Sequence, residues 1–219
     1  MTRPVYNPLD RVELGRSVGQ ALLSGDCERL PPDEKFAGAG IYAIYYHGSF
    51  GPYERVALPG CRWPIYVGRA MPAGGRAGLV GLDAPVGSKL FDRLRQHARS
   101  IILAENLDVR DFRCRCLVVD DIWIPLAERL LIGHYRPLWN GVIDGFGIHA
   151  PGSGRAAQAR STWDTLHPGR TFAEGLPPGD NLEEVEELID THLDEHPPEV
   201  DQSPLLSEDP FLGEADDSE

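Results

Sequence analysis

Two short segments rich in β-branched and aromatic residues constrain the fold of this chain most. The segment at 40–46 opens on the tripeptide Gly-Ile-Tyr, and the segment at 63–68 closes on Tyr-Val-Gly. Residues of these types favour strands, so we expect two strands that pair antiparallel and carry Tyr42 and Tyr66. A third stretch of the same character, at 112–119, predicts a third strand.

Helical patterns lie around and between the strands. Apolar residues at helical spacing predict one helix over 88–104 and another over 125–135, and Asn7 would cap a further helix near the N-terminus. The order strand, strand, helix, strand, helix predicts an α/β (α+β) fold, a small three-stranded antiparallel sheet flanked by helices. The segment at 47–62 is too long for a hairpin turn and is rich in Gly and Pro, which predicts a loop that carries function or a docking surface.

Acidic and basic residues are distributed unevenly. Sixteen of the 34 Asp and Glu residues lie in 177–219, which contains no Lys or Arg, whereas 1–176 carries 21 basic and 18 acidic residues, a net charge of +3. Within 62–115, ten basic residues outnumber five acidic ones. A surface that binds a polyanion needs local positive potential, so the whole-chain net charge of −13 does not exclude nucleic acid as a partner.

The same distribution predicts the domain organisation. We expect one domain at 1–176, with its core at about 38–142, and an acidic, flexible tail at 177–219. Apolar residues at helical spacing within 182–195 allow a helix that docks on the domain or on a partner. We favour a solvated, partly helical tail that keeps the chain soluble.

Cysteine usage and hydropathy bear on the compartment. No apolar run is long enough to span a membrane and no signal peptide is apparent, so we expect a cytoplasmic protein without membrane contact. All four cysteines are expected to stay reduced there. Cys114 and Cys116 alternate with arginines on the third strand and are predicted to be core thiols, whereas Cys27 and Cys61 are too distant in sequence to complete a zinc site.

Polar residues follow the two tyrosines at informative spacings. Arg93 and His97 are four residues apart on a predicted helix, so they share one face and can point over the sheet edge toward the tyrosines. Glu128 falls on a half-buried helix face, where a carboxylate is costly to desolvate unless it is paired or binds a cation. Taken alone, Glu128 would be interpreted as the partner of a surface arginine, Arg129 or Arg136.

The ordered set of polar and aromatic residues resembles the GIY-YIG nuclease superfamily. The set consists of Tyr42, Tyr66, Arg93, His97, Glu128 and Asn140. The branch of type II restriction endonucleases that cut CCGCGG is similar to this chain from Asn7 to about Arg170 and matches His97 and Asn140 as well. Two departures from the superfamily are a valine in the second tripeptide and a wider separation of the tripeptides, which makes the loop between them specific to this branch.

Phosphodiester hydrolysis explains why these residue types are needed. The reaction requires an activated water, charge neutralisation on the phosphate and help for the leaving oxygen. Arg93 can supply two donors to phosphate oxygens, and Glu128 can hold a hard divalent cation. The general base would be Tyr42 or His97. Deprotonating a free tyrosine near neutral pH costs roughly 4 kcal/mol, and an adjacent cation, a guanidinium and a hydrogen bond to His97 can offset this cost if Tyr42 is the base.

The resemblance assigns roles to the set. It implies Tyr42 as the base, Tyr66 as a second active-site tyrosine, Arg93 as the phosphate binder and Glu128 as the ligand of one Mg²⁺ or Mn²⁺ ion. Its implied substrate is double-stranded DNA, bound by a homodimer because a palindrome is read by two-fold symmetry. His97 and Asn140 complete the implied catalytic set.

Basic residues outside this set are candidates for DNA contacts. Arginine reads guanine in the major groove, and a site made only of G and C would use several such contacts. A packed C-terminal lid with Arg–Asp pairs is an equally weighted alternative for the residues in 145–170. The candidates are Arg69, Arg76, Lys89, Arg155, Arg160 and Arg170.

Two further functions stay open at this point. A structure-specific repair or recombination nuclease could use the same module, although such enzymes usually add a helical DNA-binding domain that this sequence does not show. A non-catalytic DNA-binding or regulatory protein is the second alternative, and the complete polar set argues against it.

Overall fold

A four-stranded antiparallel sheet forms the centre of the fold. The computed structural model describes residues 11–72, 87–147 and 158–198. The strand order is β1-β4-β2-β3, and every neighbouring pair runs antiparallel. The strands are β1 (Glu28–Arg29), β2 (Gly40–Tyr46), β3 (Pro64–Ala70) and β4 (Phe112–Val118).

The three predicted strands are confirmed as β2, β3 and β4, but the sheet has a fourth strand. β1 pairs with β4 and consists only of Glu28 and Arg29, both exposed. A two-residue polar strand carries neither the alternation nor the β-branched composition on which strand prediction depends. Its pairing is set by tertiary contacts, which is why the sequence pattern did not show it.

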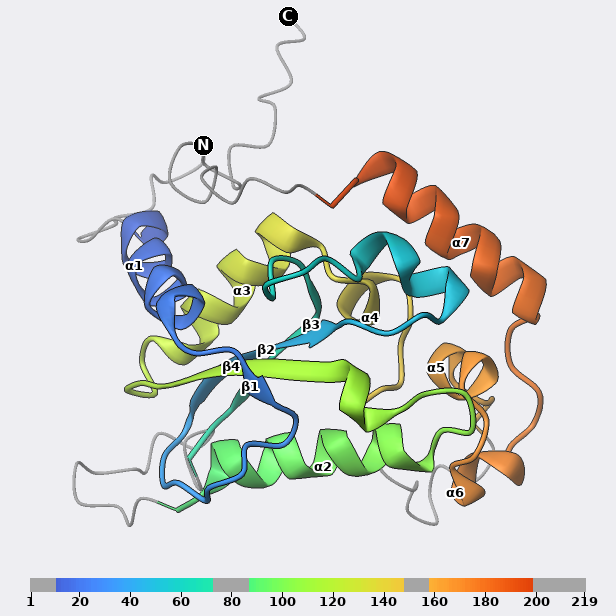
Figure 1. The fold of residues 1–219 in the computed structure, drawn as a ribbon, viewed down its shortest axis with the longest axis horizontal. Coiled ribbons are helices and arrows are strands. Elements are labelled where there is room, and N and C mark those ends of the chain that lie inside the picture. Colours follow the sequence, from blue (N-terminus) through green and yellow to red (C-terminus); the bar gives the residue numbers. More distant parts are fainter. Residues whose placement is uncertain (1–10, 73–86, 148–157, 199–219) are drawn as a thin grey trace, which may run out of the picture.

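Helices cover both sides of the sheet. Figure 1 shows α2 on one side and α1 with α3 on the other. The predicted helices at 88–104 and 125–135 are confirmed as α2 and α3, and the predicted start of the N-terminal helix at Asn7 lies outside the described residues. The helices are α1 (Arg11–Ser24), α2 (Lys89–Leu103), α3 (Ile124–Tyr135), α4 (Leu138–Gly141), α5 (Thr162–Leu166), α6 (Thr171–Glu174) and α7 (Leu182–Glu195), with 3₁₀ helices η1 (Gly51–Val56) and η3 (Val109–Asp111).

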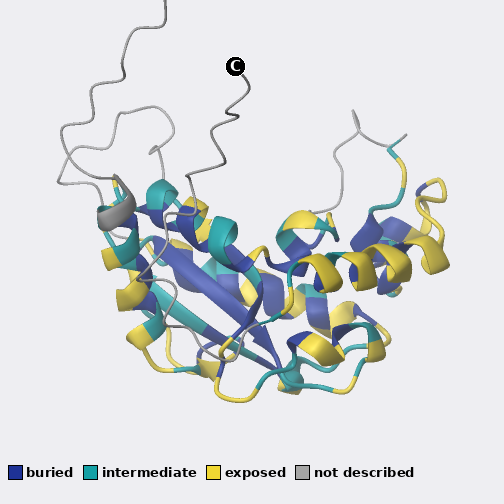
Figure 2. Cartoon of the chain, turned by 90° about the horizontal axis from the view of Figure 1, so that it is seen from above, coloured by how far each residue is buried: buried dark blue, intermediate teal, exposed yellow. Residues whose placement is uncertain are grey.

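Burial follows this layering. All seven residues of β2 are buried, because the strand lies between two other strands and beneath helices on both faces. Figure 2 shows the buried strands under helices whose outer faces are exposed. Side chains alternate across β2, so that Tyr42 reaches α2 while Tyr45 lies near Tyr135 on α3. Among the described residues, no helix has the length and apolarity that crossing a membrane would require.

The helix α7 corrects the prediction of a flexible acidic tail from residue 177. Val185, Ile189 and Leu193 are at most 1% exposed and belong to the same hydrophobic core as the sheet. The helix packs on α5 and on η1, where Arg55 donates to Asp194 at 2.8 Å. The loop predicted at 47–62 therefore serves as a docking surface within the chain. The acidic residues fill only the outer face of α7, and its apolar stripe is sufficient to dock it.

The docking of α7 predicts that substitutions at two adjacent residues of the helix change the free energy of unfolding by very different amounts. Ile189→Ala removes a fully buried side chain and should lower the free energy of unfolding by about 2–5 kcal/mol. Leu188→Ala is the matched control, because Leu188 is 52% exposed on the same helix and its loss should change stability by no more than about 0.5 kcal/mol. Urea unfolding measures both, and equal effects would contradict a docked helix.

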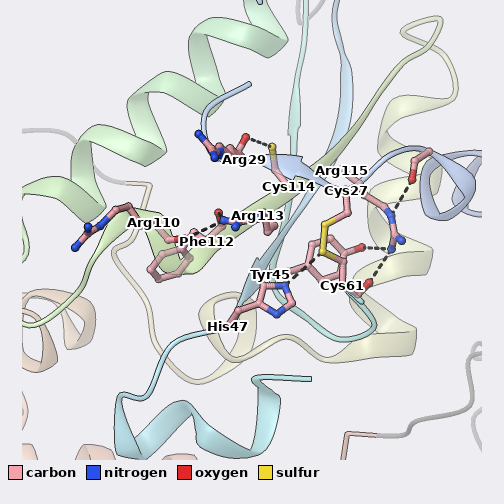
Figure 3. Close-up of a disulfide and its surroundings, with 11 residues drawn as sticks. Cys27, Arg29, Tyr45, His47, Cys61, Arg110, Phe112, Arg113, Cys114 and Arg115 are labelled. Atoms are coloured by element: carbon pink, nitrogen blue, oxygen red, sulfur yellow. Dashed lines mark hydrogen bonds between the residues drawn. A yellow bond between two sulfur atoms is a disulfide. The ribbon is translucent and has the colours of Figure 1, made fainter. Parts of the chain in front are cut away.

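A disulfide corrects the expectation that all cysteines stay reduced. Cys27 and Cys61 are bonded with their Cα atoms 6.5 Å apart, and His47 Nε2 lies 3.4 Å from the sulfur of Cys61 (Figure 3). Arg115 donates to the carbonyls of Gly25 at 3.0 Å and Cys61 at 2.7 Å, which holds the two segments side by side. The 34-residue separation concealed this pair, because the folded 47–62 loop returns the chain to β1.

The other two cysteines fit the prediction more closely. Cys114 and Cys116 are free thiols on β4, with Cys114 buried and Cys116 half-buried. Burial raises the pKa of both thiols, that of Cys116 to about 11. Neither is therefore a reactive thiolate near neutral pH.

Candidate active site

Tyr42 and His97 form a buried pair at the centre of the site. A hydrogen bond of 2.6 Å joins Tyr42 Oη on β2 to His97 Nε2 on α2. Tyr42 is 0% exposed and His97 is 1% exposed, so solvent does not screen the pair. Burial raises the pKa of Tyr42 well above its ordinary value, with a smaller contribution from Tyr66, while Arg93 lowers it. Tyr42 is therefore a neutral phenol near neutral pH.

Tyr66 lies beside this pair on the adjacent strand. Its ring centroid is 6.1 Å from that of Tyr42 and 5.3 Å from that of His97. Tyr42 pairs with Gly68 across the two strands, and a Cβ atom at Gly68 would lie 2.5 Å from Tyr42 Oη. The glycine of the second tripeptide thus leaves the space that the tyrosine of the first one fills.

Arg93 lies one helical turn before His97 and lines the cleft next to Tyr66. Its guanidinium lowers the pKa of both tyrosines, which places positive charge next to both phenol oxygens. The side chain is half-buried and donates to Gln96 at 3.4 Å. The structure therefore confirms that Arg93 and His97 point from one helix face toward the tyrosines.

Glu128 enters the cleft from α3, on the other side of the sheet edge. Its carboxylate pairs with Arg69 of β3 at 3.0 Å, and its side chain is 17% exposed. Burial raises the pKa of Glu128, and Arg69 partly offsets this shift. The partner of the carboxylate comes from a strand distant in sequence, and not from Arg129 or Arg136 on or after the same helix.

Asn140 holds the strand that carries Tyr66. Its Oδ1 accepts from the Val67 N–H at 2.8 Å, and its Nδ2 donates to the Val67 carbonyl at 2.8 Å. Among the described strands β3 lies at the edge of the sheet, so these backbone groups have no partner strand there on that side. Both the oxygen and the nitrogen of the amide are used in these bonds, and Asn140 does not line the cleft. In this structure Asn140 therefore supports the strand beside the site.

Removing this contact should loosen β3. Asn140→Ala is expected to lower the free energy of unfolding by about 1–3 kcal/mol, because it leaves two backbone groups of Val67 without their partner. It should also slow any reaction that depends on Tyr66, with little change in substrate affinity. Thermal unfolding and single-turnover rates measure the two effects. Unchanged stability together with lost activity would instead indicate direct participation of Asn140 in the chemistry.

The surface around these residues is a basic cleft of about 1060 Å³. Besides Tyr66, its walls carry five basic residues against two acidic ones, Asp92 and Glu128. The basic residues are Arg69, Lys89, Arg93, Arg95 and Arg99. Sequence reasoning named Arg69 and Lys89 as candidate DNA contacts and missed Arg95 and Arg99. Arg95 and Arg99 are four residues apart on α2, the helix that also carries Arg93, and this spacing was the signal that could have identified them.

The candidate DNA contacts near the C-terminus are corrected by the structure. Arg170 is 2% exposed and pairs with Asp164 at 2.5 Å, so it cannot reach DNA in this fold. Arg160 is partly buried and donates to a carbonyl of α6 at 3.2 Å. The alternative of a packed C-terminal lid with an Arg–Asp pair is confirmed for Arg170. Arg76 and Arg155 lie outside the described residues.

The donor set of the cleft fits a single hard cation. Over the ranges that the structure describes, no group of three or more Cys, His, Asp or Glu side chains is placed to hold a metal. Mg²⁺ does not need such a group, since it commonly binds one or two carboxylates together with substrate phosphate and water. The partly desolvated carboxylate of Glu128, on the cleft wall with Tyr66, is a suitable ligand of this kind.

The fold and site together define a class. Two tyrosines from Gly-Ile-Tyr and Tyr-Val-Gly tripeptides on paired strands, with arginine, histidine and glutamate around a basic cleft, are the arrangement expected of a GIY-YIG nuclease. The family model of the Eco29kI GIY-YIG domain matches residues 34–193, and the chain belongs to this family. The match begins later than Asn7, where the sequence resemblance starts, and extends into α7, beyond the limit near Arg170 that the resemblance suggested. A search of curated proteins finds no match.

Family membership supports a nuclease that acts on DNA. The match includes both tripeptides, α2, α3 and the segment that contains Asn140. The chain therefore carries a GIY-YIG restriction endonuclease domain, and the cleft is its candidate active site.

Proposed function

We propose that the protein is a type II restriction endonuclease that hydrolyses double-stranded DNA at a GC-rich palindrome, with CCGCGG as the candidate sequence. The observation that carries the hydrolysis of DNA is the 2.6 Å bond between Tyr42 and His97 next to a basic cleft. The cleft is lined by Tyr66, Arg93 and Glu128, so a phosphate-binding cation and a metal-binding carboxylate lie together there. The Tyr42–His97 pair is buried and contacts the cleft through the Tyr66 ring. The candidate sequence rests on the resemblance to the branch that cuts CCGCGG.

Tyr42 is proposed as the general base and His97 as the acceptor of its proton. Burial keeps Tyr42 neutral, so its proton has to leave as the attacking water is activated. His97 Nε2 is within hydrogen-bonding distance to take it. The guanidinium of Arg93 stabilises the phenolate, because it lies close enough to lower the pKa of both tyrosines.

Arg93 and Glu128 are proposed to act on the phosphate. Arg93 offers paired donors to phosphate oxygens as negative charge develops on them. Glu128 would hold the Mg²⁺ or Mn²⁺ ion, which when bound neutralises the phosphate and stabilises the leaving oxygen. Arg69, Lys89, Arg95 and Arg99 would guide the DNA backbone along the cleft.

The same proposal covers partners and location. A palindromic site calls for a homodimer in which each copy cuts one strand. We propose a cytoplasmic location, where the DNA substrate resides. The Cys27–Cys61 disulfide lies outside the cleft, so the proposed reaction does not involve it.

A plasmid digestion tests the proposal. Plasmids with one CCGCGG site, with no such site, and with scrambled sites of the same composition are incubated with Mg²⁺ or with EDTA. Discrete cleavage of the first plasmid alone, only with Mg²⁺, is the expected result. Cleavage confined to flap or junction oligonucleotides would identify a structure-specific nuclease, and DNA binding without cleavage of any substrate would identify a non-catalytic protein.

A further inference from the structure

Phe146 is an apolar aromatic residue in direct contact with two residues of the candidate site, His97 and Tyr66. Its ring stacks on the His97 imidazole with centroids 4.5 Å apart and planes 16° from parallel. It also meets the Tyr66 ring edge-on, with centroids 5.2 Å apart. Phe146 is 1% exposed, so this contact is part of the interior and not a surface lid.

An aromatic cluster fixes the ring of Phe146 from behind. The centroid of Trp139 lies 4.2 Å from it, and that of Trp163 lies 5.6 Å from it. Trp139 belongs to α4, whereas Trp163 belongs to α5. Close packing of this kind leaves a ring little freedom to tilt, so the plane of the Phe146 ring is set by the body of the protein.

Arg170 holds the backbone at the same position. It donates to the Phe146 carbonyl at 3.3 Å and to the Gly145 carbonyl at 3.0 Å. Its charge is compensated by Asp164 at 2.5 Å, and its guanidinium lies 4.4 Å from the Trp163 ring centroid. The residue first considered as a DNA contact therefore anchors the segment that carries Phe146.

We propose that Phe146 is a positioning residue that orients His97 toward Tyr42 and stabilises the imidazolium formed when His97 accepts the Tyr42 proton. The stack fixes the imidazole plane, and the electron-rich face of the Phe146 ring attracts a cation above it. This inference rests on the proposed roles of Tyr42 and His97. Its chemistry is a proton transfer alone, from the phenol oxygen to Nε2.

The neighbours of His97 make such stabilisation useful. Tyr42 and Tyr66 face it from the two strands and are neutral in the resting state, while Arg93 lies one turn away on the same helix. The positive charge of Arg93 favours the Tyr42 phenolate but opposes a second positive charge on His97. The face of Phe146 attracts the imidazolium without adding a charge that would weaken the phenolate.

Ring fluorination of Phe146 tests the inference with little change of shape. Phenylalanine carrying one, two or three ring fluorines is incorporated at position 146, and single-turnover cleavage of the cognate DNA is measured. Each fluorine weakens the π face, so the rate should fall stepwise, by about 2- to 30-fold over the series, while DNA affinity and thermal unfolding stay unchanged. The matched control is the same series at Phe112, a fully buried ring that packs on Tyr46 and Trp139.

A second readout does not depend on cleavage. The ring ¹⁵N chemical shifts of His97 give the fraction of imidazole that carries both ring protons at a fixed pH, and this fraction should fall along the Phe146 series but not along the Phe112 series. A flat response of the ¹⁵N shifts overturns the inference, even for a protein that cuts no DNA. If the wild type cleaves its site and the rate is constant across the Phe146 series, the inference is wrong while the proposed function stands.

Discussion

Glu128→Gln is expected to lower the rate of DNA cleavage by at least about 10³-fold, since the charge stabilisation supplied through a metal ligand is worth several kcal/mol. Glutamine keeps the shape of the side chain and removes its charge. Specific DNA binding should be retained, because the substitution adds no negative charge to the cleft and frees Arg69 from its ion pair. Single-turnover digestion and a binding titration on the same duplex measure the two quantities.

The control for this experiment is Arg69→Gln. It breaks the same ion pair but leaves the Glu128 carboxylate, so cleavage should survive with a modest loss of affinity. A Glu128→Gln protein that cuts at the wild-type rate in Mg²⁺ would show that this carboxylate is not the metal ligand. Equal losses in both variants would assign the effect to the ion pair.

Tyr42→Phe should reduce the cleavage rate by about 10²–10⁴-fold, the usual contribution of a general base, and leave the fold intact. Only the hydroxyl that bonds His97 is removed, while the ring continues to fill the space above Gly68. The measurement is the single-turnover rate at saturating enzyme, with thermal unfolding as a check on structure.

Tyr45→Phe is the matched control on the same strand. Tyr45 is also fully buried, but its hydroxyl reaches Arg115 on the other side of the sheet, so the rate should change little. If Tyr42→Phe remains near the wild-type rate while His97→Ala is inactive, His97 itself is the base and the proposed order of proton transfer is inverted.

The sequence was sufficient for those parts of the fold that local patterns determine. β2 and α2 were predicted because β-branched residues at 40–46 and an apolar stripe at 88–104 favour one structure each. The helix face of His97 indicated that its side chain could point toward Tyr42, and the hydrogen bond between them is seen in the structure. Four-residue spacing placed Arg93 on the same helix face as His97, and the structure confirms that placement.

Other parts depended on contacts that no local pattern encodes. The apolar spacing within 182–195 allowed a docked helix, but the acidic charge of the segment favoured a solvated tail, and only the structure decides between them. The Cys27–Cys61 bond depends on a loop that folds back. Arg170 and Asn140 show the same limit for polar residues. The donors of Arg170 would suit a nucleic acid as well as a buried carbonyl, and only the packing of α5 and α6 decides between them.

The interior position of β2 and the edge position of β3 predict that the two strands of the candidate site open at different temperatures on heating. Tyr42 is paired with Gly68 on one side and with Cys116 on the other, whereas β3, in the part of the chain that the structure describes, has a partner strand on one side only. Amide hydrogens of an interior strand exchange with solvent mainly through global unfolding, and edge strands exchange through smaller local openings. The strand that carries Tyr66 would therefore open at free energies at which Tyr42 is still protected. Cleavage would decline before the domain melts, because one wall of the cleft detaches while the proposed base stays in place.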